Sequence, residues 1–206
     1  MTSIAIYVEG GGQSKDGKAE LRVGFDGLLA QQKNAARARR MNWKTVLCGS
    51  RGEAFAAFHN AMTKQTADVV VLVVDSEEAV ADSSPQGRIA HLATRDGWQF
   101  SGVSEETVHL MVQCMEAWIV ADPEKLDEFF GQGFRRNVLP KRLVLDEEPK
   151  DLLIEALKSA TKPTKKGSYG KIEHAGKLLG MVRPGRVANR CKSFRLLTEF
   201  LDATID

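Results

Sequence analysis

The sequence predicts an α/β fold in which a mostly parallel sheet is flanked by helices and followed by a helical C-terminal extension. Short apolar segments with the composition of buried strands, at residues 3–8, 43–48 and 69–74, alternate with segments of helical composition. Residues 107–122 favour a further strand that passes into a helix, and every periodic segment after them is helical. This alternation is typical of a parallel sheet whose strands are connected by helices.

The helices have recognisable boundaries. Leu, Ala, Gln and Arg dominate residues 21–40, which favours a helix despite Gly24 and Gly27 near its start. Ser50, with Glu53 three residues later, has the pattern of a capping box and predicts the start of the next helix. The remaining helices are expected at residues 86–94, 123–131, 147–161, 168–182 and 193–205.

Length and composition indicate one main domain. The chain has 206 residues, of which 43% are hydrophobic and 27% charged, which is ordinary for a globular protein. This length is sufficient for one α/β core with an appendage. We expect a core at residues 1–122 and a basic helical extension at residues 123–206 that packs on it.

Several protein classes are disfavoured. The three cysteines are widely spaced and form no CxxC pair, so neither a disulfide framework nor a zinc site is indicated. The N-terminus lacks the basic and apolar regions of a signal peptide, and no apolar run is long enough to span a bilayer. The sequence therefore predicts a cytoplasmic protein without a membrane partner.

Charge is segregated along the chain. Residues 75–130 contain twelve acids and three basic residues, whereas residues 158–195 contain eleven Lys or Arg and one acid, Glu173. A shorter basic run covers residues 33–44. Such blocks are usually solvated faces, but a basic region beside an acidic one also suits a polyanion held over bound metal. Both interpretations stay open at the level of composition.

Acidic residues follow two of the predicted strands. Glu9 ends the first strand ahead of three glycines, and Asp75 and Glu77 end the third. The carboxyl ends of parallel strands meet at one edge of a sheet, so these carboxylates meet if the second strand lies on the outer side. In an extended chain the D-x-E spacing sends both side chains to one side. Carboxylates this close repel one another unless a cation lies between them. Their hard oxygen ligands favour Mg²⁺ or Mn²⁺.

The glycine-rich segment offers an alternative. Gly12 to Lys18 fits the pattern G-x-x-x-x-G-K of a nucleotide-binding P-loop, and the apolar strand ending at Asp75 resembles the acidic strand of such proteins. Ala19, however, stands where a P-loop has Ser or Thr, and Glu9 would oppose a phosphate bound at the loop. A P-loop-like nucleotidase is therefore an alternative and not the main interpretation.

The stretches "IYVEGGG" and "VVVLVVDSE" resemble the TOPRIM domain, a metal-binding, Rossmann-like fold shared by topoisomerases, primases and OLD-family nucleases. The resemblance implies that Glu9 takes the role of the family's glutamate, and Asp75 and Glu77 that of its D-x-D pair. Glu77 stands where the family has its second aspartate, so this side chain is longer than the family's. Glu20 resembles an additional acidic ligand of OLD-like members.

The stretches "CGSRGEA", "LVVDSE", "HLMVQCMEAWIVAD" and "SYGKIEHA" resemble a bacterial family of TOPRIM-like proteins of unknown function, over the whole chain. Members of that family are often encoded beside ATPases of the ABC or AAA type, in what look like anti-phage defence loci. The resemblance thus implies a partner ATPase and a role in phage defence.

Further polar residues complete the candidate site. Glu116 lies in an apolar run and needs a partner, either a metal ion or a lysine. Asp122 is expected to cap the helix that begins at Pro123. Lys171 is the candidate for stabilising the charge of a reacting phosphate, with Lys150 and Lys166 as alternatives. The residues expected to contact a nucleic-acid backbone are Lys150, Lys165, Lys166, Lys171 and Arg186.

These features favour a Mg²⁺- or Mn²⁺-dependent nuclease that cleaves DNA or RNA. Glu9, Asp75 and Glu77 would hold the metal, with Glu20 and Glu116 as further ligands, and Lys171 would assist. The alternatives are a non-catalytic nucleic-acid-binding or regulatory subunit, and the P-loop-like nucleotidase.

Overall fold

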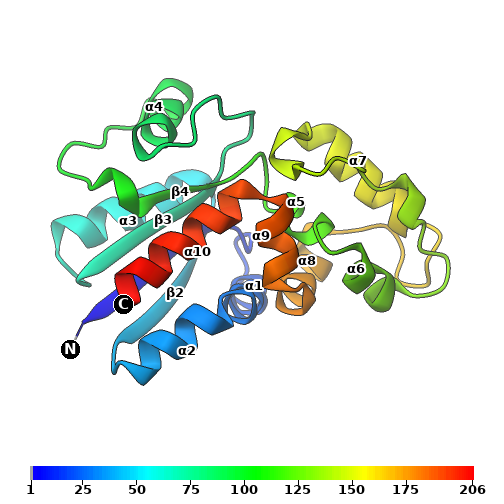
Figure 1. Ribbon diagram of the computed structural model, residues 1–206, viewed down its shortest axis with the longest axis horizontal. Coiled ribbons are helices and arrows are strands. Elements are labelled where there is room, and N and C mark those ends of the chain that lie inside the picture. Colours follow the sequence, from blue (N-terminus) through cyan, green and yellow to red (C-terminus); the bar gives the residue numbers. More distant parts are fainter. Residues whose placement is uncertain (1) are drawn as a thin grey trace.

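The computed structural model describes residues 2–206 and contains a four-stranded, all-parallel sheet with the order β2-β1-β3-β4 (Figure 1). The strands are β1 (Ser3–Glu9), β2 (Asn42–Gly49), β3 (Val69–Asp75) and β4 (Val108–Met111). β1 pairs in parallel with β2 on one side and with β3 on the other. The predicted α/β class is confirmed, and β1 and β3 are neighbours because β2 occupies the outer position.

Helices cover both faces of the sheet. On one face lie α1 (Lys15–Leu28), α2 (Ala30–Ala38) and α10 (Lys192–Ile205), and α10 crosses in front of the strands in Figure 1. On the other face lie α3 (Arg51–Thr63) and α4 (Pro85–Asp96).

The continuous apolar run of β3 follows from burial on both sides. Val71 and Val73 belong to the hydrophobic cluster beneath α1 and α10, whereas Val70, Leu72 and Val74 belong to the cluster beneath α3 and α4. Successive residues of a strand point to opposite faces, so a strand covered on both faces must be apolar throughout. Each fully buried side chain of this type contributes about 1.5–3 kcal/mol.

The C-terminal helical region lies largely beyond the carboxyl ends of the strands (Figure 1). Its helices before α10 are α5 (Glu116–Val120), α6 (Pro123–Phe130), α7 (Lys150–Thr161), α8 (Lys171–Met181) and α9 (Pro184–Arg190). Short 3-10 helices occur at Glu105–Thr107, Arg136–Val138 and Leu145–Glu147. The larger hydrophobic cluster draws on residues from both sides of position 122, and the division of the chain there stays a prediction.

Glycines bring α8 against α1. A Cβ atom on Gly24 would lie 2.3 Å from the carbonyl oxygen of Gly176, and one on Gly27 would lie 3.1 Å from the Cα atom of Gly180. The contact at Gly24 is too close for any larger residue and the contact at Gly27 is tighter than an ordinary Cβ contact, so the two helices pack backbone to backbone. This packing sets the position of the first residue of α8, Lys171, relative to the sheet.

Some predicted boundaries were wrong. The helix expected at residues 21–40 is two helices, and the first begins at Lys15, where the Ser14 hydroxyl accepts a hydrogen bond from the Gly17 amide at 3.0 Å. The helix α9 was not predicted. By contrast, the capping box of Ser50 and Glu53 is confirmed, with both reciprocal hydrogen bonds present.

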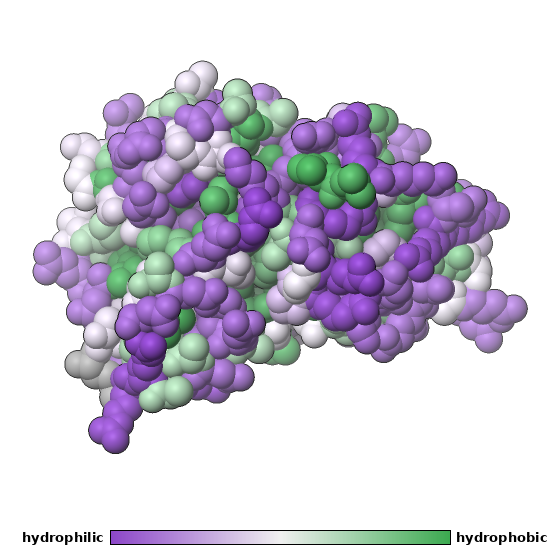
Figure 2. Space-filling model, in the orientation of Figure 1, coloured by the Kyte–Doolittle hydropathy of each residue, from purple (hydrophilic) through white to green (hydrophobic). Residues whose placement is uncertain are grey.

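The outer surface is mostly polar. Figure 2 shows a largely hydrophilic face on which hydrophobic side chains gather in small separate groups. The most exposed large hydrophobic residues are Leu143, Val23 and Ile172. None of the helices within residues 2–206 combines the length and apolar composition that a bilayer crossing requires.

Candidate metal centre

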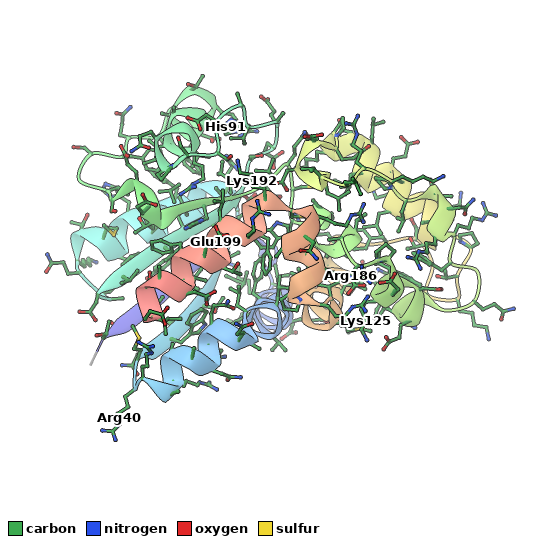
Figure 3. The ribbon with its side chains drawn as sticks, viewed as in Figure 1. Arg40, His91, Lys125, Arg186, Lys192 and Glu199 are labelled. Atoms are coloured by element: carbon green, nitrogen blue, oxygen red, sulfur yellow. The ribbon has the colours of Figure 1, made fainter. Side chains whose placement is uncertain are left out.

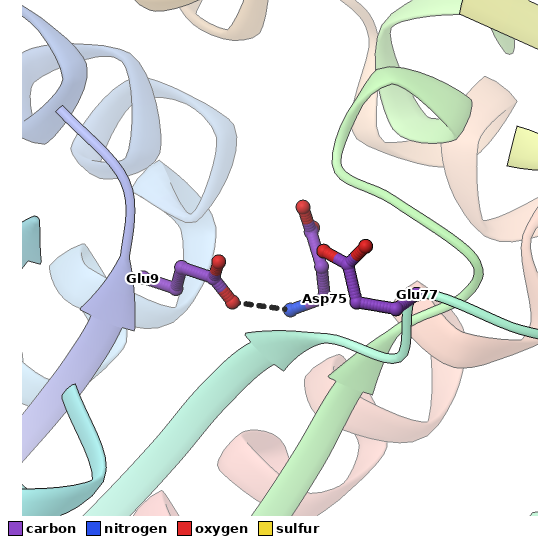
Figure 4. A group of neighbouring side chains, drawn as sticks. All are labelled: Glu9, Asp75 and Glu77. Carbon is purple, nitrogen blue, oxygen red and sulfur yellow. Dashed lines mark hydrogen bonds between the residues drawn. The ribbon is translucent and has the colours of Figure 1, made fainter. Parts of the chain in front are cut away.

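Three carboxylates meet at the carboxyl edge of the sheet. Glu9, Asp75 and Glu77 each offer an oxygen atom, and these atoms lie within 4.8 Å of one another (Figure 4). Carboxylate oxygens at this spacing are a donor set that suits a small, hard divalent cation. The group predicted from the strand ends is therefore brought together, and it can hold a divalent metal ion.

Glu9 and Asp75 owe their positions to the ends of adjacent strands. Glu9 is the last residue of β1, and its Oε2 accepts a hydrogen bond from the Asp75 amide at 3.1 Å (Figure 4). Asp75 is the last residue of β3 and is only 1% exposed. Its Oδ1 accepts a hydrogen bond from the Met115 amide at 2.7 Å, which orients the carboxylate.

Glu77 reaches the group for a different reason than predicted. The D-x-E spacing was expected to act through an extended chain, but β3 ends at Asp75 and Glu77 has a left-handed backbone with φ +69°. Its amide donates to the Gln113 carbonyl at 2.8 Å, which holds the turn in place. A non-glycine residue in this conformation costs about 1–2 kcal/mol. The strained turn brings Glu77 to the other two acids.

Each of the three acids faces a cation. The Lys150 Nζ lies 2.6 Å from Glu77 Oε2, and the Lys171 Nζ lies 3.4 Å from Asp75 Oδ2. Arg51 Nη1 lies 3.5 Å from Glu9 Oε2, and Arg51 also donates to the Asp75 carbonyl. The two lysines begin α7 and α8, so the C-terminal helices supply two of the three cations.

Sequence reasoning missed Arg51 as a site residue. It follows the helix cap Ser50 directly after β2 and is therefore at the same edge of the sheet. That position was a signal, because the residues after every strand of a parallel sheet meet at this edge. Its guanidinium is held by Asp96, at 2.9 Å from Nε and 2.7 Å from Nη2.

Glu116 adds a fourth carboxylate behind Lys171. It is 2% exposed, and its Oε1 accepts a hydrogen bond from the Tyr169 hydroxyl at 3.2 Å and lies 3.6 Å from Lys171 Nζ. Among the described residues, its Oε2 has no hydrogen-bond partner. The sequence left open whether Glu116 pairs with a lysine or a metal. The lysine is present, and the unpaired buried oxygen also fits a bound cation.

Burial shapes the charge of the group. Burial, with the Asp75 charge adding to it, raises the pKa of Glu9 to about 7, although Arg51 opposes the rise. Burial also raises the pKa of Asp75, against the effect of Lys171. Burial lowers the pKa of Lys171, but the Asp75 and Glu116 carboxylates outweigh it, and the pKa is raised overall. Lys171 therefore stays protonated beside the acids.

Other predicted residues lie elsewhere. Glu20 is outside the acidic group, and its Oε1 lies 3.4 Å from Lys177 Nζ on the surface between α1 and α8. The structure therefore does not bring this expected ligand to the other acids. Lys165 is an exposed residue in the segment before α8, and the Lys166 ammonium lies 5.0 Å from the centre of the Phe129 ring.

Arg186 and Asp122 also lie apart from the acidic group. Arg186, which Figure 3 labels, is on α9, and its Nη2 atom lies 3.9 Å from Glu124 Oε2. Asp122 takes the expected N-cap position of α6, but its carboxylate makes no cap hydrogen bond with the described residues and instead accepts from Arg183 Nε at 2.7 Å and Nη2 at 2.6 Å. Asp122 is fully buried, and a buried carboxylate needs a charged partner, which Arg183 supplies.

The glycine loop borders the site. Gly10, Gly11 and Gly12 have positive φ angles of 128°, 84° and 59°, which only glycine adopts without strain. The loop lines a cavity of about 340 Å³ that reaches from Glu9 to Lys171. The Lys18 ammonium of the P-loop-like pattern donates to the carbonyl of Cys48 at 3.0 Å.

The family model described as "Domain of unknown function (DUF4276)" matches residues 8–202. The chain belongs to this family. The DUF4276 match includes all three acids of the metal centre and both lysines that face them. No curated protein and no solved structure matches the chain. Membership in DUF4276 agrees with the expected family of unknown function, and the relationship to TOPRIM domains and OLD-family nucleases stays a proposal.

Proposed function

We propose that this chain is a metal-dependent phosphodiesterase of TOPRIM type that cleaves nucleic acid. The observation that supports it is the group of Glu9, Asp75 and Glu77, whose carboxylate oxygens lie within 4.8 Å of one another. Lysines from α7 and α8 face these acids. Acids that gather a cation beside lysines that attract an anion are what phosphoryl transfer requires.

In this proposal the acids bind the metal ion and a lysine binds the phosphate. Glu9, Asp75 and Glu77 would hold Mg²⁺ or Mn²⁺, with the free oxygen of Glu116 close behind. A divalent ion bound there supplies a Lewis acid and lowers the pKa of coordinated water. Lys171, which lies 3.4 Å from Asp75 and 3.6 Å from Glu116, would bind a non-bridging phosphate oxygen and stabilise the charge that develops on it.

The remaining basic residues would hold the backbone of the substrate. Lys150 lies beside the acids, while Lys165, Lys166 and Arg186 extend the positive charge across the C-terminal helices. Lysine and arginine on phosphates give affinity without reading the base sequence. Cleavage is therefore expected to depend little on sequence.

The test is a cleavage assay with supercoiled plasmid and structured RNA, in Mg²⁺ or Mn²⁺, with Asp75→Asn as the site variant. Asp151→Asn, which changes an exposed acid on α7, is the matched control. We expect metal-dependent cleavage by the wild type and the control, and a loss on the order of 10³-fold in Asp75→Asn. Cleavage that survives in Asp75→Asn would contradict the proposed site.

A second candidate is a non-catalytic nucleic-acid-binding or regulatory subunit. It is favoured by one observation, that Arg51, Lys150 and Lys171 already face the three acids. Salt-sensitive binding of duplex without cleavage, in either metal and with a partner ATPase added, would support it over the nuclease. Control by an ATPase and a role in phage defence belong to the same proposal. Nucleotide binding that is lost in Lys18→Ala would instead support the nucleotidase.

A further inference from the structure

A cavity of about 340 Å³ opens beside the metal centre, between the glycine loop and the start of α8. Two of its lining residues are charged, Glu9 and Lys171, and both belong to the metal centre. The other lining side chains are Leu21 of α1 and Ile172 of α8. The rest of the wall is glycine, namely Gly10, Gly11, Gly12, Gly17, Gly49 and Gly176. We call this space the glycine cavity.

The wall of the glycine cavity is uncharged beyond Glu9 and Lys171. Ile172 follows Lys171 directly and is 63% exposed, so its side chain offers apolar surface to a ligand. The amides of Gly11 and Gly12 make no hydrogen bond to the residues that the structure describes, so they are free donors. Apolar surface with a few polar groups is typical of small-ligand pockets. The glycine cavity therefore suits the uncharged part of a ligand whose anionic part lies at Lys171.

The width of the glycine cavity is set by the packing of α1 against α8, which lie side by side (Figure 1). A Cβ atom on Gly176 would lie 2.7 Å from the carbonyl oxygen of Glu20, so the two backbones are already in contact. The cavity therefore keeps its size. A volume of 340 Å³ is near the lower end of the usual range for small-ligand pockets, about 300–1,000 Å³. This space suits one nucleoside and not a base pair.

We propose that the glycine cavity receives one unpaired nucleoside of the substrate, so that the chain cleaves single strands and loops in preference to duplex. The assignment rests on the proposed function, because a phosphate bound at Lys171 places the adjoining sugar and base at the cavity. A base in a duplex must first be unpaired and unstacked, which costs a few kcal/mol. No polar side chain lines the wall beyond the metal centre, so the cavity accepts every base.

The binding test uses thymidine 5′-monophosphate and 1,2-dideoxyribose 5-phosphate, which is the same sugar phosphate without the base. Neither probe contains a phosphodiester bond, so binding to the full chain in Mg²⁺ is measured without cleavage, by calorimetry and by NMR of the Ile172 δ1 methyl group. We expect the nucleotide to bind at least about tenfold more tightly and to shift the methyl signal, because its base buries apolar surface. Equal affinity for the two probes, or an unmoved methyl signal at saturation, would overturn the proposal.

A variant locates the base. Ile172→Ala removes apolar surface from the cavity and leaves a good helix former at an exposed position. We expect it to weaken binding of the nucleotide by about threefold or more and to leave the sugar phosphate unchanged. Val23→Ala, on a similarly exposed residue of α1 outside the cavity, should change neither affinity. A nucleotide affinity in Ile172→Ala equal to that of the wild type would contradict the assignment.

A cleavage test separates this proposal from the proposed function. The substrate is a nucleic-acid hairpin, and we expect cleavage in its loop to be at least about tenfold faster than in its stem. Equal rates in loop and stem would overturn the unpaired-nucleoside site and leave the phosphodiesterase standing. Absence of cleavage, with the nucleotide bound and the Ile172 signal shifted, would contradict the phosphodiesterase and support the nucleotide site.

Discussion

The metal centre and the groove beside the edge strand β4 are two polar regions of one sheet, and they differ in how charge is balanced. The groove consists of two cavities, and Arg88, His109 and Lys192 line both. In the metal centre, Asp75 and Glu77 face lysines and Glu9 faces an arginine. In the groove beside β4, Arg88 and Lys192 form no ion pair with the residues that the structure describes and donate to backbone and hydroxyl oxygens instead. The carboxylates that line the same cavities lie beyond ion-pair distance of these two cations; they are Asp82, Glu106, Asp146, Glu147 and Glu199. The first site is compensated by direct ion pairs, whereas Arg88 in the second is compensated at longer range by Glu106 and Asp82.

The two sites also differ in what holds them. The acids of the metal centre are anchored to strand ends, by the Asp75 amide on Glu9 and the Met115 amide on Asp75. Arg88 is anchored by the carbonyl of Val108, a residue of the edge strand that has no further strand beside it. Edge strands need their exposed polar groups covered, and here a cationic side chain does so. The cation therefore has a structural role that places it in the groove.

The largest expected effect concerns pH and His109. The pKa of His109 is lowered from 6.5 to about 3 in the folded protein. The buried neutral ring therefore contributes its full stability above pH 6.5, and this contribution is lost as the pH falls from 6.5 towards 3. Between pH 7 and pH 4 the contribution falls by about 3 kcal/mol. In His109→Phe this part of the pH dependence should disappear, measured as urea unfolding at both pH values.

The comparison between wild type and His109→Phe isolates this residue, because Glu9 and Asp146, whose pKa values are raised, titrate alike in both proteins. An equal change of unfolding free energy with pH in the two proteins would show that His109 is not buried neutral in the groove.

A second prediction tests the charge balance of the metal centre. Lys171→Met leaves Asp75 and Glu116, 1% and 2% exposed, without their shared cation. We expect a loss of about 2 kcal/mol of unfolding free energy in EDTA. This is less than for a fully buried pair because the Lys171 side chain is 44% exposed. Millimolar Mg²⁺ should restore part of it, since the ion replaces the missing charge.

The matched control is Lys177→Met, on the same helix, whose ion pair with Glu20 lies on the surface. It should change stability by less than about 0.5 kcal/mol and show no response to Mg²⁺. If Lys171→Met is as stable as this control, the acids of the metal centre are not held by charge compensation.

The smallest effect is expected at the basic surface, which neither site includes. The double variant Lys165→Gln/Lys166→Gln should leave stability unchanged and weaken duplex binding to the same degree for different sequences. The slope of log affinity against log salt should fall by about 2, or about 0.9 per lost phosphate contact. Lys44→Gln/Lys64→Gln, which removes two exposed lysines elsewhere, is the control. Equal slopes in both double variants would remove Lys165 and Lys166 from the interface.

Sequence reasoning succeeded where local pattern and strand order decide the outcome. The apolar runs and the capping box at Ser50 are local, and they predicted the α/β class. Glu9 and Asp75 could be placed together because parallel strands end at one edge. Glu77 was placed correctly for a wrong reason, since its left-handed turn depends on a hydrogen bond to Gln113, 36 residues later in the chain.

A parallel sheet with acids at the ends of β1 and β3 could be predicted from sequence alone, because strand burial and helix caps depend on short local stretches. Which cations meet those acids depends on contacts between elements that are distant in the chain. Lys171 reaches the acids because Gly24 of α1 packs closely on Gly176 of α8, and these two helices are far apart in the chain. Tertiary contacts also place Arg88 beside His109 with Glu106 and Asp82 at longer range, because the compensation of a charge depends on what lies nearby in space and not on spacing along the chain.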